Sequence, residues 1–437
     1  MAAELTAPLV ETRPTRASVV GWVLYDLANT IFSINIVSFY FSAWIRTQVG
    51  AERADSTYAL TAAVSYAIIF IVSPLLGALT DQAPRRMPFL VVSTLLCVLL
   101  TAALGQGGLW VSLALFVGAN IAYQAGLQFY DALLPDVSTE ENRGWIGGVG
   151  VGVGYFGSYI GIGSGLLLLD KIGYPGMFLL TAALFLLFAI PCFLLVREHP
   201  NARARAFDGQ SLGLAFRQIR TTIANAERYP GVLRFLVGRI FYTDAVNTVI
   251  SIMGLYVINL AVSRGLSEEA GSKTAQLILL GAITFAVIGG FAWGAAVDRI
   301  GPKRTLDMVL GLWVLVFIAA AAIGLLGLPL PIFYGVAAAA GIALGGTWAA
   351  DRPYMQRISP PAKLGEFYGL YGMVGRFSAI TGPLIWAGVL ATSRGRLPTE
   401  IGQAIGVLIL MSLVIVGYVI LRPVSDARRV WGPEDAG

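Results

Sequence analysis

Four polar residues recur in the same order and at the same spacing at two places in an otherwise apolar chain. They are Asp26, Asn29, Thr30 and Ser33 in the first copy, and Asp244, Asn247, Thr248 and Ser251 in the second. An α-helix turns by about 100° per residue, so each set lies on one face about 100° wide. A carboxylate within an apolar helix costs free energy and is by default a functional hypothesis. Each polar stripe is therefore expected to face a water-filled cavity or the other half of the protein.

Two roles are open for the carboxylates of these stripes. On a translocation path they would bind a cationic group or a proton, whereas in a structural role they would pair with an arginine or cap a neighbouring helix. Arg239 and Arg376 are the cations within apolar segments, and Arg376 is the candidate partner for either carboxylate. The substrate and proton pathway is predicted to use Tyr25, Asp26, Asn29, Ser33, Tyr123, Gln124, Asp244, Asn247, Ser251 and Arg376.

The composition is that of a membrane protein. The hydrophobic fraction is 57%, charged residues make up 13% and the mean hydropathy is +0.74, whereas soluble domains contain about 25% charged residues. Runs of about 20 apolar residues, the length that crosses a hydrocarbon core, cover most of the chain. They predict twelve membrane helices at residues 18–45, 56–80, 87–106, 109–134, 143–170, 174–197, 231–263, 273–298, 303–326, 329–357, 362–392 and 399–422.

The predicted fold is an all-α membrane protein with two pseudo-symmetric six-helix bundles. Residues 1–197 would form the N-terminal bundle, 198–230 a cytoplasmic linker and 231–437 the C-terminal bundle. If both termini and the linker share one side, that side collects 21 of the 30 Lys and Arg residues and the opposite side holds 7. The positive-inside rule then places both termini in the cytoplasm. The same distribution explains the net charge of +5 without a nucleic-acid partner.

A second pair of repeated segments follows the helices at 56–80 and 273–298. Their glycines permit close helix packing, and each Asp can pair with basic residues across the loop or lie at the positive N-terminus of another helix. Such contacts would form in one conformation and break in another. We therefore predict a conformational latch formed by Gly77, Asp81, Arg85, Arg86, Gly294, Asp298, Arg299, Lys303 and Arg304.

The second of these segments resembles the Gly-x-x-x-Asp-Arg-x-Gly-x-Lys/Arg motif of the major facilitator superfamily. After Gly294, the matching residues are Asp298, Arg299, Gly301, Lys303 and Arg304. The first segment departs from the motif, since Gln82 replaces the basic residue and Pro84 stands at the glycine. The N-terminal latch is therefore expected to be weaker or differently paired.

Other segments narrow this resemblance. They are Tyr25–Thr30, Phe129–Asp136, Gly238–Asp244, Gly345–Thr347 and Glu366–Tyr371. Together they resemble the branch of the superfamily that includes the autophagy-related fungal vacuolar amino-acid effluxers and many bacterial members. The resemblance implies efflux of amino acids or similar small solutes by alternating access.

Three features concern the packing of the helices. Residues of helix 109–134 form a polar stripe that either lines a cavity or bonds to neighbouring helices, namely Asn120, Tyr123, Gln124, Gln128 and Asp131. The many glycines of helix 143–170 are expected to pack closely against another helix, with Gly281, Gly289, Gly290 and Gly294 of helix 273–298 as candidates. Asp351 and Arg352, near the end of helix 329–357, are expected to form contacts of a cytoplasmic gate.

The sequence also argues against several functions. It contains no GxxxxGK[ST] phosphate loop, so ATP-driven transport by this chain is not expected. Cys97, Cys192 and His199 do not make a metal-ligand set, so we expect no metal, no cofactor and no catalytic residue.

The prediction is a monomeric secondary transporter in the inner membrane that moves a small solute, such as an amino acid, and uses a proton as its coupling ion. One alternative is a non-transporting sensor or assembly factor with the same fold. A membrane enzyme is a weaker alternative, because the sequence shows no acid/base cluster at an interface.

Overall fold

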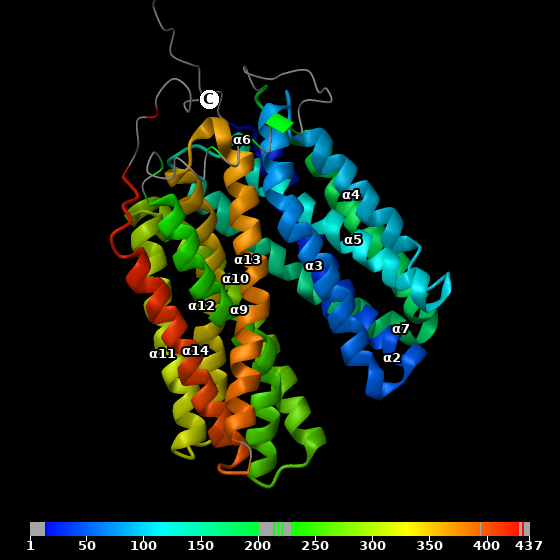
Figure 1. The fold of residues 1–437 in the computed structure, drawn as a ribbon, viewed down its shortest axis with the longest axis vertical. Coiled ribbons are helices and arrows are strands. Elements are labelled where there is room, and N and C mark those ends of the chain that lie inside the picture. Colours follow the sequence, from blue (N-terminus) through cyan, green and yellow to red (C-terminus); the bar gives the residue numbers. More distant parts are fainter. Residues whose placement is uncertain are drawn as a thin grey trace, which may run out of the picture.

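The computed structural model describes residues 14–200, 231–393 and 395–427, together with residues 213, 214, 217, 221, 229 and 431. The long elements of these ranges are all helices (Figure 1). Most of the predicted linker at 198–230 lies outside the described residues.

The helices of the N-terminal half are α1 (Arg16–Phe32), the π-helix η1 (Ser33–Tyr40), α2 (Phe41–Val49), α3 (Ala51–Gln82), α4 (Met87–Ala102), α5 (Gly108–Ala132), α6 (Leu134–Val137) and α7 (Arg143–Leu195). Those of the C-terminal half are α9 (Val232–Ser263), α10 (Glu268–Ile300), α11 (Pro302–Leu325), α12 (Ile332–Ile358), the short 3-10 helix η3 (Pro361–Lys363), α13 (Leu364–Ser393) and α14 (Thr399–Leu421).

Ten of these spans are long and apolar enough to cross a membrane. One of them, α7, contains two of the predicted passes, because Gly173 has φ 63° and turns the chain between residues 143–170 and 174–197. A positive φ of this kind is readily adopted only by glycine. The apolar helix α4 has 16 residues and corresponds to the predicted helix 87–106. Each of the twelve predicted membrane helices therefore has a counterpart in the structure.

The first membrane pass is not a uniform α-helix, although the predicted polar stripe was based on α-helical geometry throughout. Residues Ser33–Tyr40 form a π-helix between α1 and α2. A π-helix bonds residue i to residue i+5 and so contains more residues per turn than an α-helix. The polar stripe that begins at Asp26 therefore ends at Ser33, and the residues that follow face in other directions.

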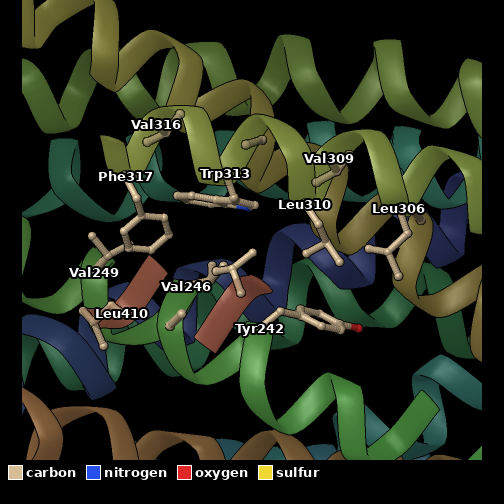
Figure 2. Packing of buried hydrophobic residues seen from close by; sticks show 14 of the residues in the cluster. Tyr242, Val246, Val249, Leu306, Val309, Leu310, Trp313, Val316, Phe317 and Leu410 are labelled. Carbon is tan, nitrogen blue, oxygen red and sulfur yellow. The ribbon is translucent and has the colours of Figure 1, made fainter. Parts of the chain in front are cut away.

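Buried apolar side chains form a separate core in each half. The core of the C-terminal half lies between α9, α11 and α14, where Val246, Trp313, Phe317 and Leu410 pack together (Figure 2). The Nε1–H of Trp313 donates to the hydroxyl of Thr347 at 2.9 Å, so the polar atom of this buried indole has a partner.

The two halves meet at the end of the molecule where α1 begins and α14 ends, which we call the terminal end. Between α7 and α10, a Cβ added at Gly148 would lie 2.4 Å from the carbonyl oxygen of Gly290 and 2.6 Å from the Cα of Gly294. Between α3 and α13, a Cβ added at Gly77 would lie 2.1 Å from the carbonyl oxygen of Gly365. Helix backbones approach this closely only where side chains are absent.

The predicted glycine packing of helix 143–170 against helix 273–298 is therefore confirmed for Gly290 and Gly294. It is wrong for Gly281, where an added Cβ would meet nothing within 4 Å, and for Gly289, which faces Ile342 of α12. Only one face of α10 meets α7, and these two glycines lie elsewhere on the helix.

Away from the terminal end the two halves diverge (Figure 1). Midway along the α7–α10 pair, the hydroxyls of Tyr159 and Thr284 are 2.5 Å apart. Further along α7, a Cβ added at Gly163 would meet nothing within 4 Å. The close contact between the halves is thus concentrated toward one end.

We expect Gly148→Val to push the halves apart at the terminal end, because its side chain has no space against the backbone of α10. Spin labels attached to Arg85→Cys and Arg304→Cys, two exposed positions of opposite halves at this end, would report a longer distance. The native Cys97 and Cys192 are buried and should not react. Gly163→Val is the control, and an equal distance in both variants would contradict the packing described here.

Candidate functional site

Two carboxylates cap helices of the opposite half. At the end of α3, Asp81 accepts hydrogen bonds from the backbone N–H groups of Gly365 and Glu366 at 2.8 and 2.7 Å, where α13 begins. At the end of α10, Asp298 accepts from the N–H groups at positions 144 and 145 at 2.7 Å each, where α7 begins. The first N–H groups of a helix lack intrahelical partners and carry partial positive charge, so a carboxylate there is stabilised. The helix N-terminus is therefore the partner of the latch carboxylate in both copies.

The basic residues of the predicted latch contribute less. Arg86 contacts Asp81 at 3.0 Å, whereas Lys303 pairs with Asp307, one turn along its own helix. The remaining basic residues are exposed, namely Arg85, Arg299 and Arg304. Among the described residues, the predicted ion pair between a latch carboxylate and a basic residue across the loop therefore forms only at Arg86. In the second copy that prediction is wrong, because backbone N–H groups of α7 bind the carboxylate oxygens of Asp298.

Deeper in the same interface, one guanidinium joins two carboxylates. Arg352 of α12 lies 3.1 Å from Asp131 of α5 and 3.4 Å from Asp26 of α1. Both carboxylates are buried and belong to the N-terminal half, so these ion pairs cross between the halves. Arg352 therefore contacts the other half at this end, as expected, and its role in a cytoplasmic gate stays a prediction. The expectation that Arg376 pairs with Asp26 is wrong.

A second buried ion pair lies wholly within the C-terminal half. Arg239 of α9 donates to the carboxylate of Asp351 at 2.8 Å and to the backbone carbonyl of Tyr371 at 2.9 Å. The hydroxyls of Tyr242 and Tyr371 also donate to Asp351. The guanidinium and the carboxylate compensate each other and are well hydrogen-bonded, as a buried ion pair requires.

The surroundings of Arg376 differ from those of Arg239. The guanidinium of Arg376 is buried, with 6% of the residue exposed, and it donates to the hydroxyl of Ser73 at 2.9 Å and to the backbone carbonyl of Gln124 at 3.0 Å. Its Nε–H is buried and has no hydrogen-bond partner in the part of the chain that the structure describes. Within the described ranges no carboxylate lies in ion-pair contact with it.

The depth of Arg376 is also distinctive. It lies twelve residues from the start of α13, which is about 18 Å along the axis at about 1.5 Å per residue. This distance places the guanidinium near the middle of a hydrocarbon core of about 30 Å. Its partners Ser73 and Gln124 belong to the other half, so the cation lies between the halves.

Asp244 bonds within its own half and not to Arg376. Its carboxylate accepts the backbone N–H of Gly382 at 2.7 Å and the hydroxyl of Thr381, both in the middle of α13. Pairing of Asp244 with Arg376 is therefore also wrong. Of the other residues in this stripe, Asn247 is half-buried and Ser251 is exposed.

The N-terminal stripe is more enclosed. Asn29 is buried, and neither its side-chain oxygen nor its nitrogen has a hydrogen-bond partner among the described residues. Ser33 is half-buried at the start of the π-helix. The hydroxyl of Tyr25 lies 2.6 Å from that of Thr94, and that of Tyr123 donates to the carbonyl of Asn29 at 3.4 Å, so both tyrosines brace the N-terminal half.

The polar stripe of α5 holds helices together and also reaches the other half. Asn120 donates to Ser65 at 2.7 Å. Gln128 accepts from the hydroxyl of Ser73 at 2.6 Å and donates to the carbonyl of the same residue at 3.0 Å. Interhelical bonding is thus the role of these two amides, whereas Gln124 faces Arg376.

Asp131 and Arg352 lie near the ends of predicted helices and are not among the predicted pathway residues. Their significance depends on α1, α5 and α12 meeting at one point, which no spacing along the chain shows. A signal was nevertheless present. Each is a charged residue inside a predicted apolar helix, and such charges need a partner.

The arrangement of the helices matches solved structures of the major facilitator superfamily. The structure of the proton:xylose symporter XylE aligns with 94% of this chain over 95% of its own chain, with a TM-score of 0.68 and a sequence identity of 13%. The human organic anion transporter MFSD10 covers 93% of this chain and 98% of its own with a TM-score of 0.63 at 19% identity. A bacterial homologue of the iron transporter ferroportin, in its outward-facing state, gives a TM-score of 0.67 at 15% identity. The alignment covers 93% of this chain and 98% of that one. The fold is that of a multi-pass major facilitator transporter.

Sequence comparison defines the family more narrowly. The chain belongs to the Atg22-like family, because residues 44–429 match the family described as "Vacuole effluxer Atg22 like". The uncharacterized MFS-type transporter YxiO of Bacillus subtilis is 27% identical over 91% of this chain and 94% of its own length. Autophagy-related protein 22 of Coccidioides immitis is 26% identical over 64% of this chain and 48% of its own length. The resemblance predicted from the sequence is confirmed, and the chain is a non-enzymatic transporter of a small molecule.

We expect Asp81→Asn and Asp298→Asn each to open the terminal end. Each substitution removes a charge and one of two acceptors, and a hydrogen bond to a charged group contributes about 1.5–3 kcal/mol. The ratio of closed to open molecules should fall about tenfold or more, measured with the labels at Arg85→Cys and Arg304→Cys. Asp307→Asn is the control, since Asp307 pairs within α11. An equal shift in all three variants would contradict a specific role for the caps.

Proposed function

We propose that this protein is a proton-coupled secondary transporter of a small solute that carries a carboxylate group, such as an amino acid. It works by alternating access of a site between its halves. The excess of Lys and Arg at the terminal end supports an inner-membrane location with both termini in the cytoplasm. We expect a single chain to be sufficient, because both sides of the site come from one polypeptide.

The geometry supports an outward-facing conformation. The terminal end is held closed by the capped helices and by the ion pairs of Arg352. On α7, beyond Tyr159, a Cβ added at Gly163 would meet nothing within 4 Å. With the termini in the cytoplasm, the diverging end of the molecule faces the exterior (Figure 1).

The observation that carries the proposal is the buried, uncompensated charge of Arg376. Removal of a guanidinium from water is costly unless a carboxylate and hydrogen bonds replace the lost hydration. Arg239, which is also buried, has such a carboxylate in Asp351, whereas among the described residues Arg376 bonds only to neutral oxygens. A cation left in this state between the halves is suited to bind an anionic group of the substrate, because arginine binds carboxylates strongly.

We expect Arg376→Gln to abolish binding and counterflow of carboxylate solutes in proteoliposomes. The probes would be a panel of amino acids, each compared with its amide, which has the same side chain and no carboxylate. The wild type should bind the acid and not the amide, and Arg376→Gln should bind neither. Arg264→Gln, at the outer end of α9, is the control.

Two results would count against this proposal. Equal binding of acid and amide by the wild type would contradict recognition of a carboxylate by Arg376. Binding without counterflow would favour a non-transporting sensor with the same fold.

Proton coupling is supported by the charges around Arg352. Two carboxylates, Asp26 and Asp131, share this single guanidinium, so the group as a whole holds an excess negative charge that one proton would neutralise. Protonation would weaken ion pairs that cross between the halves. The uptake of a proton would then favour the opening of the terminal end.

We expect Asp131→Asn and Asp26→Asn to abolish the acceleration of net transport by a pH gradient while counterflow at equal pH persists. Counterflow does not require the protonation step, so the two assays separate coupling from substrate binding. Asp307→Asn, at the surface of α11, should leave both unchanged. Full acceleration by a pH gradient in both variants would refute the assignment.

A further inference from the structure

The contact between α3 and α13 extends from the terminal end toward the middle of the membrane. Near the end of α3, a Cβ added at Gly365 would lie 2.6 Å from the carbonyl oxygen of Gly77. About one turn deeper, a Cβ added at Gly369 would lie 2.7 Å from the carbonyl oxygen of Ser73. Arg376 lies deeper again on α13, and its guanidinium also reaches α3 at Ser73. The close contact between these helices therefore leads from the terminal end to Arg376.

Ser73 is bonded to both halves of the protein. Its hydroxyl oxygen accepts from a guanidinium N–H of Arg376 at 2.9 Å. The hydroxyl hydrogen can be donated to the side-chain oxygen of Gln128 at 2.6 Å or to the backbone carbonyl of Gly369 at 3.0 Å. A hydroxyl has one hydrogen and two lone pairs, so it can accept from Arg376 while it donates to either of the other two. Ser73 thus holds the guanidinium against the N-terminal half.

The hydrogen bonds of Arg376 depend on the closed terminal end. Among the described residues, its guanidinium donates to Ser73 of α3 and to Gln124 of α5, whereas Arg376 itself belongs to α13. Movement of α3 away from α13 would break these bonds. The guanidinium would then lie near the middle of the membrane without the oxygens that now solvate it, which is costly for a cation.

We propose that the contact between Arg376 and Ser73 helps to hold the terminal end closed, and that the carboxylate of a solute replaces it. Ser73 is then a positioning residue, because it acts through Arg376. The same guanidinium would serve both as a contact between the halves in the empty protein and as the partner of the solute in the loaded protein.

This exchange of partners links loading to opening. A carboxylate would supply the charge and the acceptors that the guanidinium loses when the halves separate. It binds more strongly when the terminal end is open, because Ser73 and Gln124 no longer compete for the guanidinium. A ligand shifts the population toward the conformation that it binds more strongly. The empty protein therefore remains closed and the loaded protein opens, a consequence that rests on the carboxylate recognition proposed above.

The first test needs no solute. It measures the distance between labels at Arg85→Cys and Arg304→Cys in the purified protein. Ser73→Ala removes an acceptor of Arg376, so the ratio of closed to open molecules should fall about tenfold, as expected for loss of a hydrogen bond to a charged group.

Ser65→Ala is the matched control. Ser65 is also a buried serine of α3 that bonds to an amide of α5, since it accepts from Asn120 at 2.7 Å. Its hydrogen bonds to Asn120 and to the carbonyl of Ala62 lie within the N-terminal half. An equal shift in Ser65→Ala and Ser73→Ala would overturn the proposal, because it would reflect loosening of α3 against α5.

A double-mutant cycle separates the bond to Arg376 from the other bonds of Ser73. In an Arg376→Met background, Ser73→Ala should change the ratio of closed to open molecules by less than about twofold, because its partner is already absent. A tenfold change that persists in this background would show that Ser73 acts through Gln128 or Gly369, and would overturn the proposal.

The second test adds acetate to the purified protein and compares it with acetamide, which has nearly the same shape and no charge. Acetate should lengthen the distance between the labels in a saturable manner, and acetamide should not. Arg376→Met should respond to neither. An unchanged distance with acetate, or an equal response to acetamide, would overturn the replacement of Ser73 by a carboxylate.

These outcomes differ from failure of the transport proposal. The distances report the contact between Arg376 and Ser73 without any transport, whereas failure of the transport proposal would show as carboxylate counterflow that persists in Arg376→Gln.

Discussion

The structure depends on two carboxylates that bind the ends of helices in the opposite half. Asp81 and Asp298 each hold two backbone N–H groups that no helix can satisfy from within. Asp81 and Asp298 occupy corresponding positions in the two repeated segments. The halves are therefore held together by one such contact between α3 and α13 and by a second between α10 and α7. Close to these carboxylates, Gly77 and Gly148 let the backbones of the facing helices approach closely enough for the hydrogen bonds to form. The ion pairs of Arg352 lie deeper in the same interface and rely on that approach.

The balance of buried charge separates structural from functional arginines. Arg239 and Asp351 neutralise each other within one half, and hydrogen bonds surround them. Arg352 joins two carboxylates across the halves, and Arg376 has none in the described ranges. An uncompensated charge in a membrane interior is costly. A proton would restore neutrality at the carboxylates of Arg352, and an anionic solute would restore it at Arg376.

The sequence was sufficient for the helices but not for the partners of the charged residues. Apolar runs and the repeated Asp motifs predicted twelve passes, and the close packing of Gly148 with Gly290 followed from glycine content alone. The pairing of Asp26 with Arg352 could not be foreseen, because it joins residues 326 positions apart in different halves. The π-helix after Phe32 was equally hidden, since it changes the direction of side chains without changing composition.

Part of the contact between α7 and α10 is made by backbone atoms, because Gly148 faces Gly290 and Gly294 there. Glycine has no side-chain rotamers, so closing this part of the surface orders no side chain and opening it releases none. Neither conformation gains side-chain entropy over the other at these three glycines. This patch therefore has little preference of its own for either conformation, and the polar contacts around it, such as those of Asp298, decide which conformation is populated.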